Sequence, residues 1–156
     1  MNELAGEWFR RAYEHQMAGR LDEAIECYRK SIDLAPTAEA HTFLGWTYSF
    51  QRRYDLAIEE CRKAIGVDPT FGNPYNDIGA YLIELGRLDE AIPWFEKAID
   101  APRYDPRHFP HFNLSRIYVK RYDYKKAIRH LRKALELEPD YRVARRELAK
   151  LLAWMN

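Results

Sequence analysis

An alanine–isoleucine pair recurs four times along this chain at nearly constant spacing. The pairs are Ala24-Ile25, Ala57-Ile58, Ala91-Ile92 and Ala127-Ile128, which lie 33, 34 and 36 residues apart. Each pair lies in an amphipathic stretch with helical periodicity, and a second such stretch precedes it. One helix pair cannot bury its apolar face alone, so a period of about 34 residues predicts a stacked array of helix pairs.

Three further positions keep one type of residue in every unit. The first helix has a small residue where the two helices are expected to cross, at Ala12, Gly45, Gly79 and Ser115. The second helix has a large residue (Tyr28, Cys61, Phe95, Leu131) and then a small one (Ser31, Ala64, Ala98, Ala134). With these positions the chain resembles a bacterial-type tetratricopeptide repeat protein. The resemblance implies an all-α fold, a right-handed superhelical α-solenoid of helix–turn–helix repeats with a C-terminal capping helix.

The repeat boundaries follow from the prolines and the turn residues. We expect repeats at 5–37, 38–71, 72–107 and 108–141 and a capping helix at 142–155, all within a single domain spanning 1–156. The pairs should end near Pro36, Pro69, Pro102 and Pro139, because proline lacks the amide that would continue a helix. Pro93 is expected in the first turn of its helix, where it costs little.

The packing faces can be predicted from spacing within the first helices. The stripes Ala40/Leu44/Thr47, Pro74/Ile78/Tyr81 and Pro110/Leu114/Ile117 should pack on the preceding repeat. The same face of the opening helix has Glu7, Arg11 and Glu14, which should meet water, and the closing helix has a polar surround. We therefore expect nine helices, capped at both ends.

Charge and cysteine content bound the class of protein. Residues 1–102 hold 11 Lys and Arg against 18 Asp and Glu, whereas residues 103–156 hold 14 against 6. This asymmetry is either drift among solvated faces or a sign of an acidic partner or of head-to-tail self-association. No apolar run is long enough to insert in a membrane. Cys27 and Cys61 fall in different repeats and are expected to be reduced thiols, which favours a cytoplasmic location.

Residues 101–110 form the one irregular connector and contain three prolines. One interpretation is a protruding loop that contacts a partner through Arg103, Tyr104 or Arg107. The other is a stiff spacer that sets the angle between the third and fourth repeats.

The resemblance implies that ligands lie along the concave face lined by the first helices. On this sequence that groove comprises Phe9, Tyr13, Trp46, Asn73, Asn76, Asp77, Phe112, Asn113, Arg116 and Lys120. Aromatic residues dominate one end, amides the middle and basic groups the far end, which suits a peptide or helical segment of another protein, with an acidic group near Arg116. We expect Phe9, Tyr13, Phe112 and Arg116 to be exposed, whereas Trp46 fits a core position equally well.

Other functions are less well supported by the sequence. Family members that grip the C-terminal carboxylate of heat-shock chaperones use basic residues, but the matching positions here are Phe9, Tyr13, Phe43, Asn73 and Asp77. We predict no cofactor, no metal and no enzymatic activity, since His108 and His111 lack a third ligand. The alternatives are a scaffold that self-assembles head to tail and, less favoured, RNA binding by the basic C-terminal half.

Overall fold

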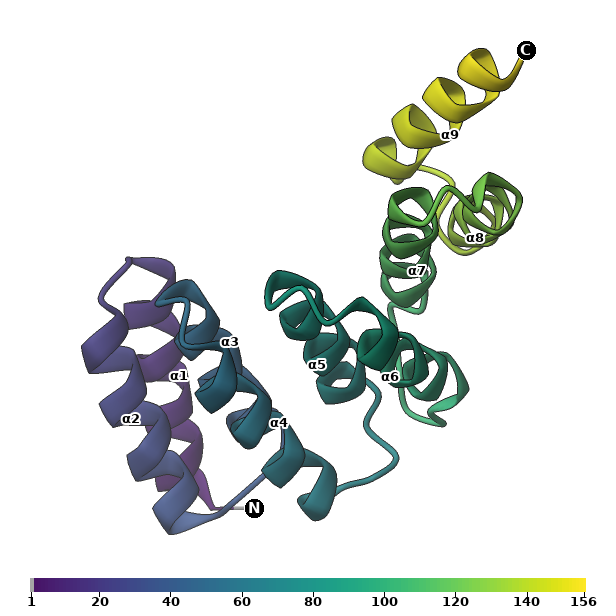
Figure 1. The fold of residues 1–156 in the computed structure, drawn as a ribbon. Coiled ribbons are helices and arrows are strands. Elements are labelled where there is room, and N and C mark those ends of the chain that lie inside the picture. The colour runs from purple at the N-terminus through teal and green to yellow at the C-terminus, as the bar shows by residue number, and fades with distance from the viewer. Residues whose placement is uncertain (1) are drawn as a thin grey trace.

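The computed structural model describes residues 2–156, and this part of the chain folds into nine α-helices (Figure 1). The helices are α1 (Glu3–Met17), α2 (Leu21–Leu34), α3 (Ala38–Phe50), α4 (Tyr54–Val67), α5 (Asn73–Glu84), α6 (Leu88–Asp100), α7 (His108–Lys120), α8 (Tyr124–Leu137) and α9 (Arg142–Met155). Consecutive helices form four antiparallel pairs, with α9 packed on α8. The all-α solenoid and the nine helices expected from the sequence are confirmed.

Each helix pair is joined by the same tight turn. Gly19, Arg52, Gly86 and Tyr122 occupy equivalent places in the four turns, and all have positive φ, at 80°, 59°, 76° and 61°. Glycine adopts this left-handed conformation without steric cost, but Arg52 and Tyr122 do so against their Cβ atoms. The backbone geometry is similar in all four turns, but the turns at Arg52 and Tyr122 are strained because their residue is not glycine.

Pro93 departs from the sequence prediction. It is the sixth residue of α6, so it lies beyond the first turn. At this position its missing amide removes a helical hydrogen bond to the carbonyl of Asp89. The prediction that Pro93 lies in the first turn of its helix is therefore wrong, and its side chain is exposed at this position.

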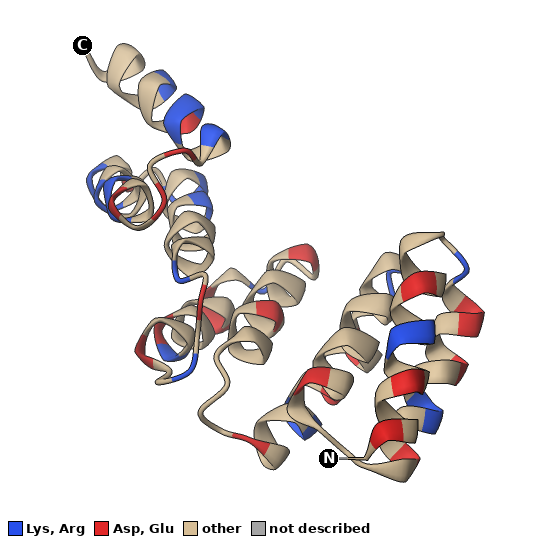
Figure 2. Ribbon diagram, turned by 180° about the vertical axis from the view of Figure 1, so that it is seen from behind, with Lys and Arg blue, Asp and Glu red and all other residues tan. Residues whose placement is uncertain are grey.

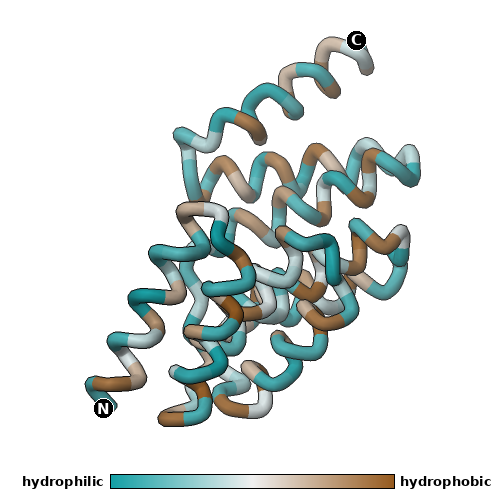
Figure 3. The backbone as a smooth tube through the Cα atoms, turned by 90° about the vertical axis from the view of Figure 1, so that its left-hand side faces the viewer, coloured by the Kyte–Doolittle hydropathy of each residue, from teal (hydrophilic) through white to brown (hydrophobic). Residues whose placement is uncertain are grey.

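The repeated residues build the core. The second-helix alanines and the large residues after them, Tyr28, Cys61, Phe95 and Leu131, are all completely buried. The stripes of α3, α5 and α7 that were expected to face the preceding repeat are also buried along their whole length. Glu7, Arg11 and Glu14 of α1 are exposed, as expected. Hydrophobic and hydrophilic residues alternate along the helices within successive turns, as one-sided packing requires (Figure 3).

The first helices of the pairs line one side of the array. Helices α1 and α3, α3 and α5, and α5 and α7 contact one another directly, and no comparable contact joins successive second helices in the described chain. The array therefore curves with α3, α5 and α7 on its inner face and α4, α6 and α8 outside (Figure 1). We call the inner side the concave face.

The connector at 101–110 folds back onto the array rather than protruding. The amide of Gly72 donates to the carbonyl of Arg103 (3.1 Å), and the amide of Arg103 donates to the carbonyl of Thr70 (3.0 Å). A Cβ at Gly72 would lie 2.3 Å from that of Tyr104, so only glycine allows this approach. Tyr104 is buried, so the interpretation that this connector protrudes from the array is wrong.

Candidate functional site

The concave face is hollowed at its centre by a pocket of about 300 Å³. Its walls come from α3, from α5 and the connector segment that precedes it, and from the 101–110 connector with the start of α7. The lining residues are Thr42, Phe43, Trp46, Phe71, Asn73, Asn76, Asp77, Tyr104, Pro106 and Phe109. We call this hollow the central pocket.

Aromatic side chains form most of the wall. The rings of Phe43 and Trp46 meet edge to face with centroids 5.8 Å apart, and Trp46 also contacts Phe50. Phe71 reaches the pocket through its backbone bridge to Arg103, while Tyr104 is held over Gly72. Phe109, in the first turn of α7, remains 38% exposed. These rings give the pocket a rigid apolar surface.

Asp77 is the one charged residue among those that line the central pocket. It is half-buried, and burial raises its pKa to about 7, although a hydrogen bond from the Asn76 side chain acts in the opposite direction. Burial is the main reason why the pKa values of Cys61, Tyr81 and Tyr104 are raised, and the negative charge of Asp77 is the second reason. The carboxyl group is thus surrounded by side chains that are neutral at pH 7.

A chain of polar side chains runs from Asp77 toward the fourth repeat. Asn113 on α7 donates from Nδ2 to Oδ1 of Asn76 on α5 (3.1 Å), and Arg116 donates to Oδ1 of Asn113 (3.3 Å). Four of the residues predicted for the groove are therefore brought together. Asn113 spans the seam between the third and fourth repeats, so this chain also fixes the position of α7 relative to α5.

Several predicted residues lie outside the central pocket. Phe9 lines a cavity of about 430 Å³ near the N-terminus, and Phe112, Arg116 and Lys120 line one of about 300 Å³ between α7 and α9. Tyr13 is 42% exposed, as expected. The expectation of exposure was wrong for the other three residues. Phe9, Phe112 and Arg116 are half-buried: Phe9 packs on Tyr28 and Phe43, Phe112 packs on Tyr141 (5.2 Å), and Arg116 is drawn to Asn113.

Sequence reasoning missed two walls of the central pocket. Phe71 lies in a connector, outside any helical pattern, and Tyr104 belongs to the connector that was considered only as a loop or spacer. Gly72 was the available signal, because a glycine next to a helix start often allows two backbones to approach closely.

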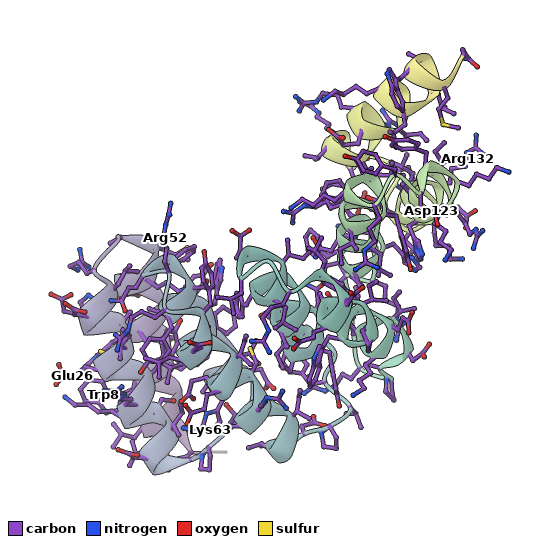
Figure 4. All side chains as sticks on the ribbon, in the orientation of Figure 1. Trp8, Glu26, Arg52, Lys63, Asp123 and Arg132 are labelled. Atoms are coloured by element: carbon purple, nitrogen blue, oxygen red, sulfur yellow. The ribbon has the colours of Figure 1, made fainter. Side chains whose placement is uncertain are left out.

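Charged and histidine side chains elsewhere are engaged with one another. Nδ1 of His41 bonds Oε2 of Glu60 (2.8 Å), and Nδ1 of His111 lies 3.0 Å from Nδ1 of His130. Within residues 2–156, no three His, Cys, Asp or Glu side chains gather as a metal site would require, and no helix is long and apolar enough to cross a membrane. Basic residues prevail on α7–α9 (Figure 2). Those of α8, such as Arg132, project outward (Figure 4).

Family models described as tetratricopeptide repeat match three parts of this chain, at residues 5–37, 38–71 and 71–139. Anaphase-promoting complex subunit 3 of Schizosaccharomyces pombe is 30% identical over 136 residues, which cover 86% of this chain and 20% of that protein. The type IV pilus assembly protein PilF of Pseudomonas aeruginosa is 27% identical over 135 residues, covering 86% of this chain and 54% of PilF. The chain therefore spans about a fifth to a half of the length of these relatives.

Solved structures agree on the fold. The structure of Pseudomonas aeruginosa PilF superposes with a TM-score of 0.90 at 25% identity, covering 98% of this chain and 69% of that one. YrrB, whose structure is described as that of a tetratricopeptide repeat protein with an unusual peptide-binding site, superposes with a TM-score of 0.72 at 20% identity, over 92% and 73% of the two chains. At that identity, YrrB supports the fold alone.

Proposed function

This chain belongs to the tetratricopeptide repeat family, and from that premise we propose that it is an adaptor that binds a peptide or helix of another protein along its concave face. Proteins of this family generally mediate protein–protein interactions and are non-catalytic adaptors. An open array of stacked helix pairs offers a long surface rather than an enclosed reaction chamber.

The observation that carries the proposal is a row of three hollows along the concave face. The N-terminal cavity, the central pocket and the cavity between α7 and α9 are each lined mainly by first helices of the pairs, by connectors or by α9, and Ser31 of α2 and Leu131 of α8 complete two of them. Aromatic side chains and arginine, which dominate the energetics of protein interfaces, line them.

Chemistry differs between the ends of this surface. Arg116 and Lys120 lie in the cavity near α9 and suit an acidic group of the partner, with arginine able to bond a carboxylate through two N–H groups. Asp77 gives the central pocket the opposite charge. A partner with charges of both signs, spaced along one segment, would match the face in a single orientation. The cytoplasmic location inferred from the thiols stays a prediction.

Peptide selection tests the proposal without knowledge of the partner. A random phage-displayed peptide library would be selected on the whole chain, and the affinities of the enriched peptides measured for variants. Arg116→Glu and Phe112→Ala should weaken binding at least about tenfold, that is, by about 1.4 kcal/mol or more. Arg132→Glu makes the same charge change on the outer helix α8 and should change affinity less than twofold. A loss in Arg132→Glu with no loss in Arg116→Glu would overturn the proposal.

A specific observation also favours a second candidate, end-to-end self-association. Helix α9 exposes Val143, Leu152, Trp154 and Met155, and the two halves of the chain differ in charge (Figure 2). Such a heterologous contact would give molecular mass that grows with protein concentration and falls with added salt. A constant monomer mass in sedimentation equilibrium at low salt would remove this candidate. RNA binding is the weaker alternative, because the basic residues of α8, such as Arg132, project outward from the array.

A further inference from the structure

The central pocket combines aromatic walls with a single carboxyl group. We propose that it receives one cationic side chain, a lysine or an arginine, of the bound partner, with Asp77 as the counter-ion. This inference rests on the proposed function and adds the specificity of one subsite. It points to a partner chemistry opposite to that of the Arg116 end of the same face.

The walls suit a cation with an apolar stem. Phe43, Trp46, Phe71 and Phe109 present rings to one volume of about 300 Å³, which is small enough for one side chain rather than a folded segment. Aromatic faces attract ammonium and guanidinium groups, and tryptophan does so most strongly. The methylene stem of lysine or arginine buries well against such rings while its charged end remains free to pair.

The chain's own basic residues near the pocket are occupied elsewhere. Arg103 lies over the ring of Phe71 (4.3 Å), but its guanidinium bonds Asp68 (2.7 Å) and Glu39 (3.2 Å). Arg107 donates to the backbone carbonyls of Ile99 and Ala101.

Arg116, farther along the concave face, reaches Asn113 rather than the carboxyl group of Asp77. Among residues 2–156, therefore, no cation compensates Asp77. A carboxylate in an apolar environment is unfavourable unless a counter-ion pairs with it. The pocket should therefore favour a charged over an uncharged partner side chain more strongly than an exposed acid would.

The same arrangement makes binding depend on pH. Burial holds the pKa of Asp77 near 7, and the titratable groups that feel its charge are Cys61 on α4, Tyr81 on α5 and Tyr104 in the connector. All three are uncharged between pH 5 and 8, because burial raises the pKa of each. Only ionised Asp77 pairs with a cation, so affinity should rise by about tenfold per pH unit below 7 and level off above it.

Two small probes that differ only by the terminal ammonium group test this subsite. N-acetyl-lysine amide and its uncharged analogue N-acetyl-norleucine amide would each be titrated into the whole protein and followed by amide chemical shifts. At pH 8 the lysine probe should shift amides of Asn73, Asp77 and Phe109, with an affinity at least about tenfold above that of norleucine. At pH 6 this advantage should shrink about tenfold, while norleucine binding stays constant. N-acetyl-arginine amide shows which of the two cations fits better.

Matched variants assign the effect to the carboxyl group. Asp77→Asn keeps the shape of the side chain and should abolish both the preference for lysine and its pH dependence. Asp100→Asn removes an exposed carboxyl at the end of α6 and should leave both unchanged. Equal shifts with lysine and norleucine, no shifts with either probe, or an unaltered preference in Asp77→Asn would each overturn the inference.

The adaptor function and the cation subsite can be tested separately. Selected peptides that need Arg116 but bind Asp77→Asn as well as wild type would remove the cation subsite and leave the adaptor function intact. Lysine-selective shifts at the central pocket, together with peptides indifferent to every concave variant, would keep the subsite and remove the adaptor function.

Discussion

The second and fourth repeats have a histidine at the same position of their first helices, but the two histidines have different partners. His41 on α3 bonds Glu60 on α4, nineteen residues on, at 2.8 Å. His111 on α7 faces His130 on α8, also nineteen residues on, at 3.0 Å. The backbone register is thus identical, but one pair joins an acid to a base and the other joins two bases.

The two pairs respond to acid in different ways. Burial alone would raise the pKa of Glu60, but hydrogen bonds from His41 and Lys63 outweigh it and lower the pKa. Burial, with the charge of His130 as a second cause, lowers the pKa of His111 to about 4. The comparison shows that helix crossing sets the scaffold, while the electrostatics of each repeat remain a local property.

The crossing residue gives the largest expected difference between the two repeats. A Cβ at Gly45 would lie 2.9 Å from the carbonyl oxygen of Ala57 and 3.3 Å from Sγ of Cys61, whereas the fourth repeat has Ser115 at this point. Gly45→Ser should therefore lower the free energy of unfolding by about 2–3 kcal/mol, because the backbones must separate. The matched change Ser115→Ala should cost less than about 1 kcal/mol, since its hydroxyl bonds only the nearby Phe112 carbonyl. Urea unfolding measures both, and equal losses would contradict a difference in helix spacing.

Exchanging the partners of the histidines should exchange their behaviour. Glu60→His removes the bonds to His41 and Lys63 and should lower the free energy of unfolding by about 2 kcal/mol at pH 7.5. The loss should grow on acidification to pH 5.5, because histidines kept neutral by burial bind fewer protons than they do in the unfolded chain, where their pKa is about 6.5. Urea unfolding at the two pH values would show this. A pH profile parallel to that of wild type would refute the assignment.

The reverse exchange should repair the fourth repeat. His130→Glu places a carboxylate beside His111, at a position where Arg129 and Lys126 help to lower the pKa of the present histidine, His130. It should raise the pKa of His111 toward its ordinary range or above, and add about 1 kcal/mol to the free energy of unfolding at pH 6. The titration of His111 by nuclear magnetic resonance measures the first effect. A pKa that stays near 4 would show that burial alone controls this histidine.

The smallest expected effect concerns a feature that the two repeats share. Arg52→Gly and Tyr122→Gly should each raise the free energy of unfolding by about 0.5–1 kcal/mol, because glycine relieves the left-handed turn at φ 59° and 61°. Arg52 projects from the α3–α4 turn, so it has little packing to lose (Figure 4). Gly86→Ala, with φ 76°, is the converse control and should destabilise by a similar amount. Thermal unfolding would detect these shifts, and a destabilised Arg52→Gly would show that the side chain matters more than the turn.

The core of this molecule could be predicted because each requirement is local and is repeated four times. A small residue such as Gly79 is needed wherever two helices cross, and a ring such as Phe95 fills the space opposite, where a Cβ at Gly79 would come within 2.6 Å. The position of Pro93 was misjudged because periodicity locates a helix better than it locates the first residue.

The candidate site was only partly predictable. Asn76, Asp77 and Asn113 lie on regular first helices, α5 and α7, which the repeat pattern assigns to the concave side. Phe71 and Tyr104 lie in two connectors that are joined by tertiary hydrogen bonds, and no periodic signal marks such a contact. The raised pKa of Asp77 depends on these connectors as well, since they help to bury it.

The folded-back connector also bears on how the array comes apart. Most contacts here join neighbours in sequence, and such arrays unfold by fraying repeat by repeat from their ends. Arg103 of the third repeat ties that repeat to the second one more firmly, since it bonds Asp68 and Glu39, the latter 64 residues away, while its backbone pairs with Thr70 and Gly72. The exposed ion pairs add little energy individually, but they and the backbone bonds are lost together. The second and third repeats should therefore open as one cooperative unit, and hydrogen exchange would find their amides protected to the same degree after the end helices have exchanged.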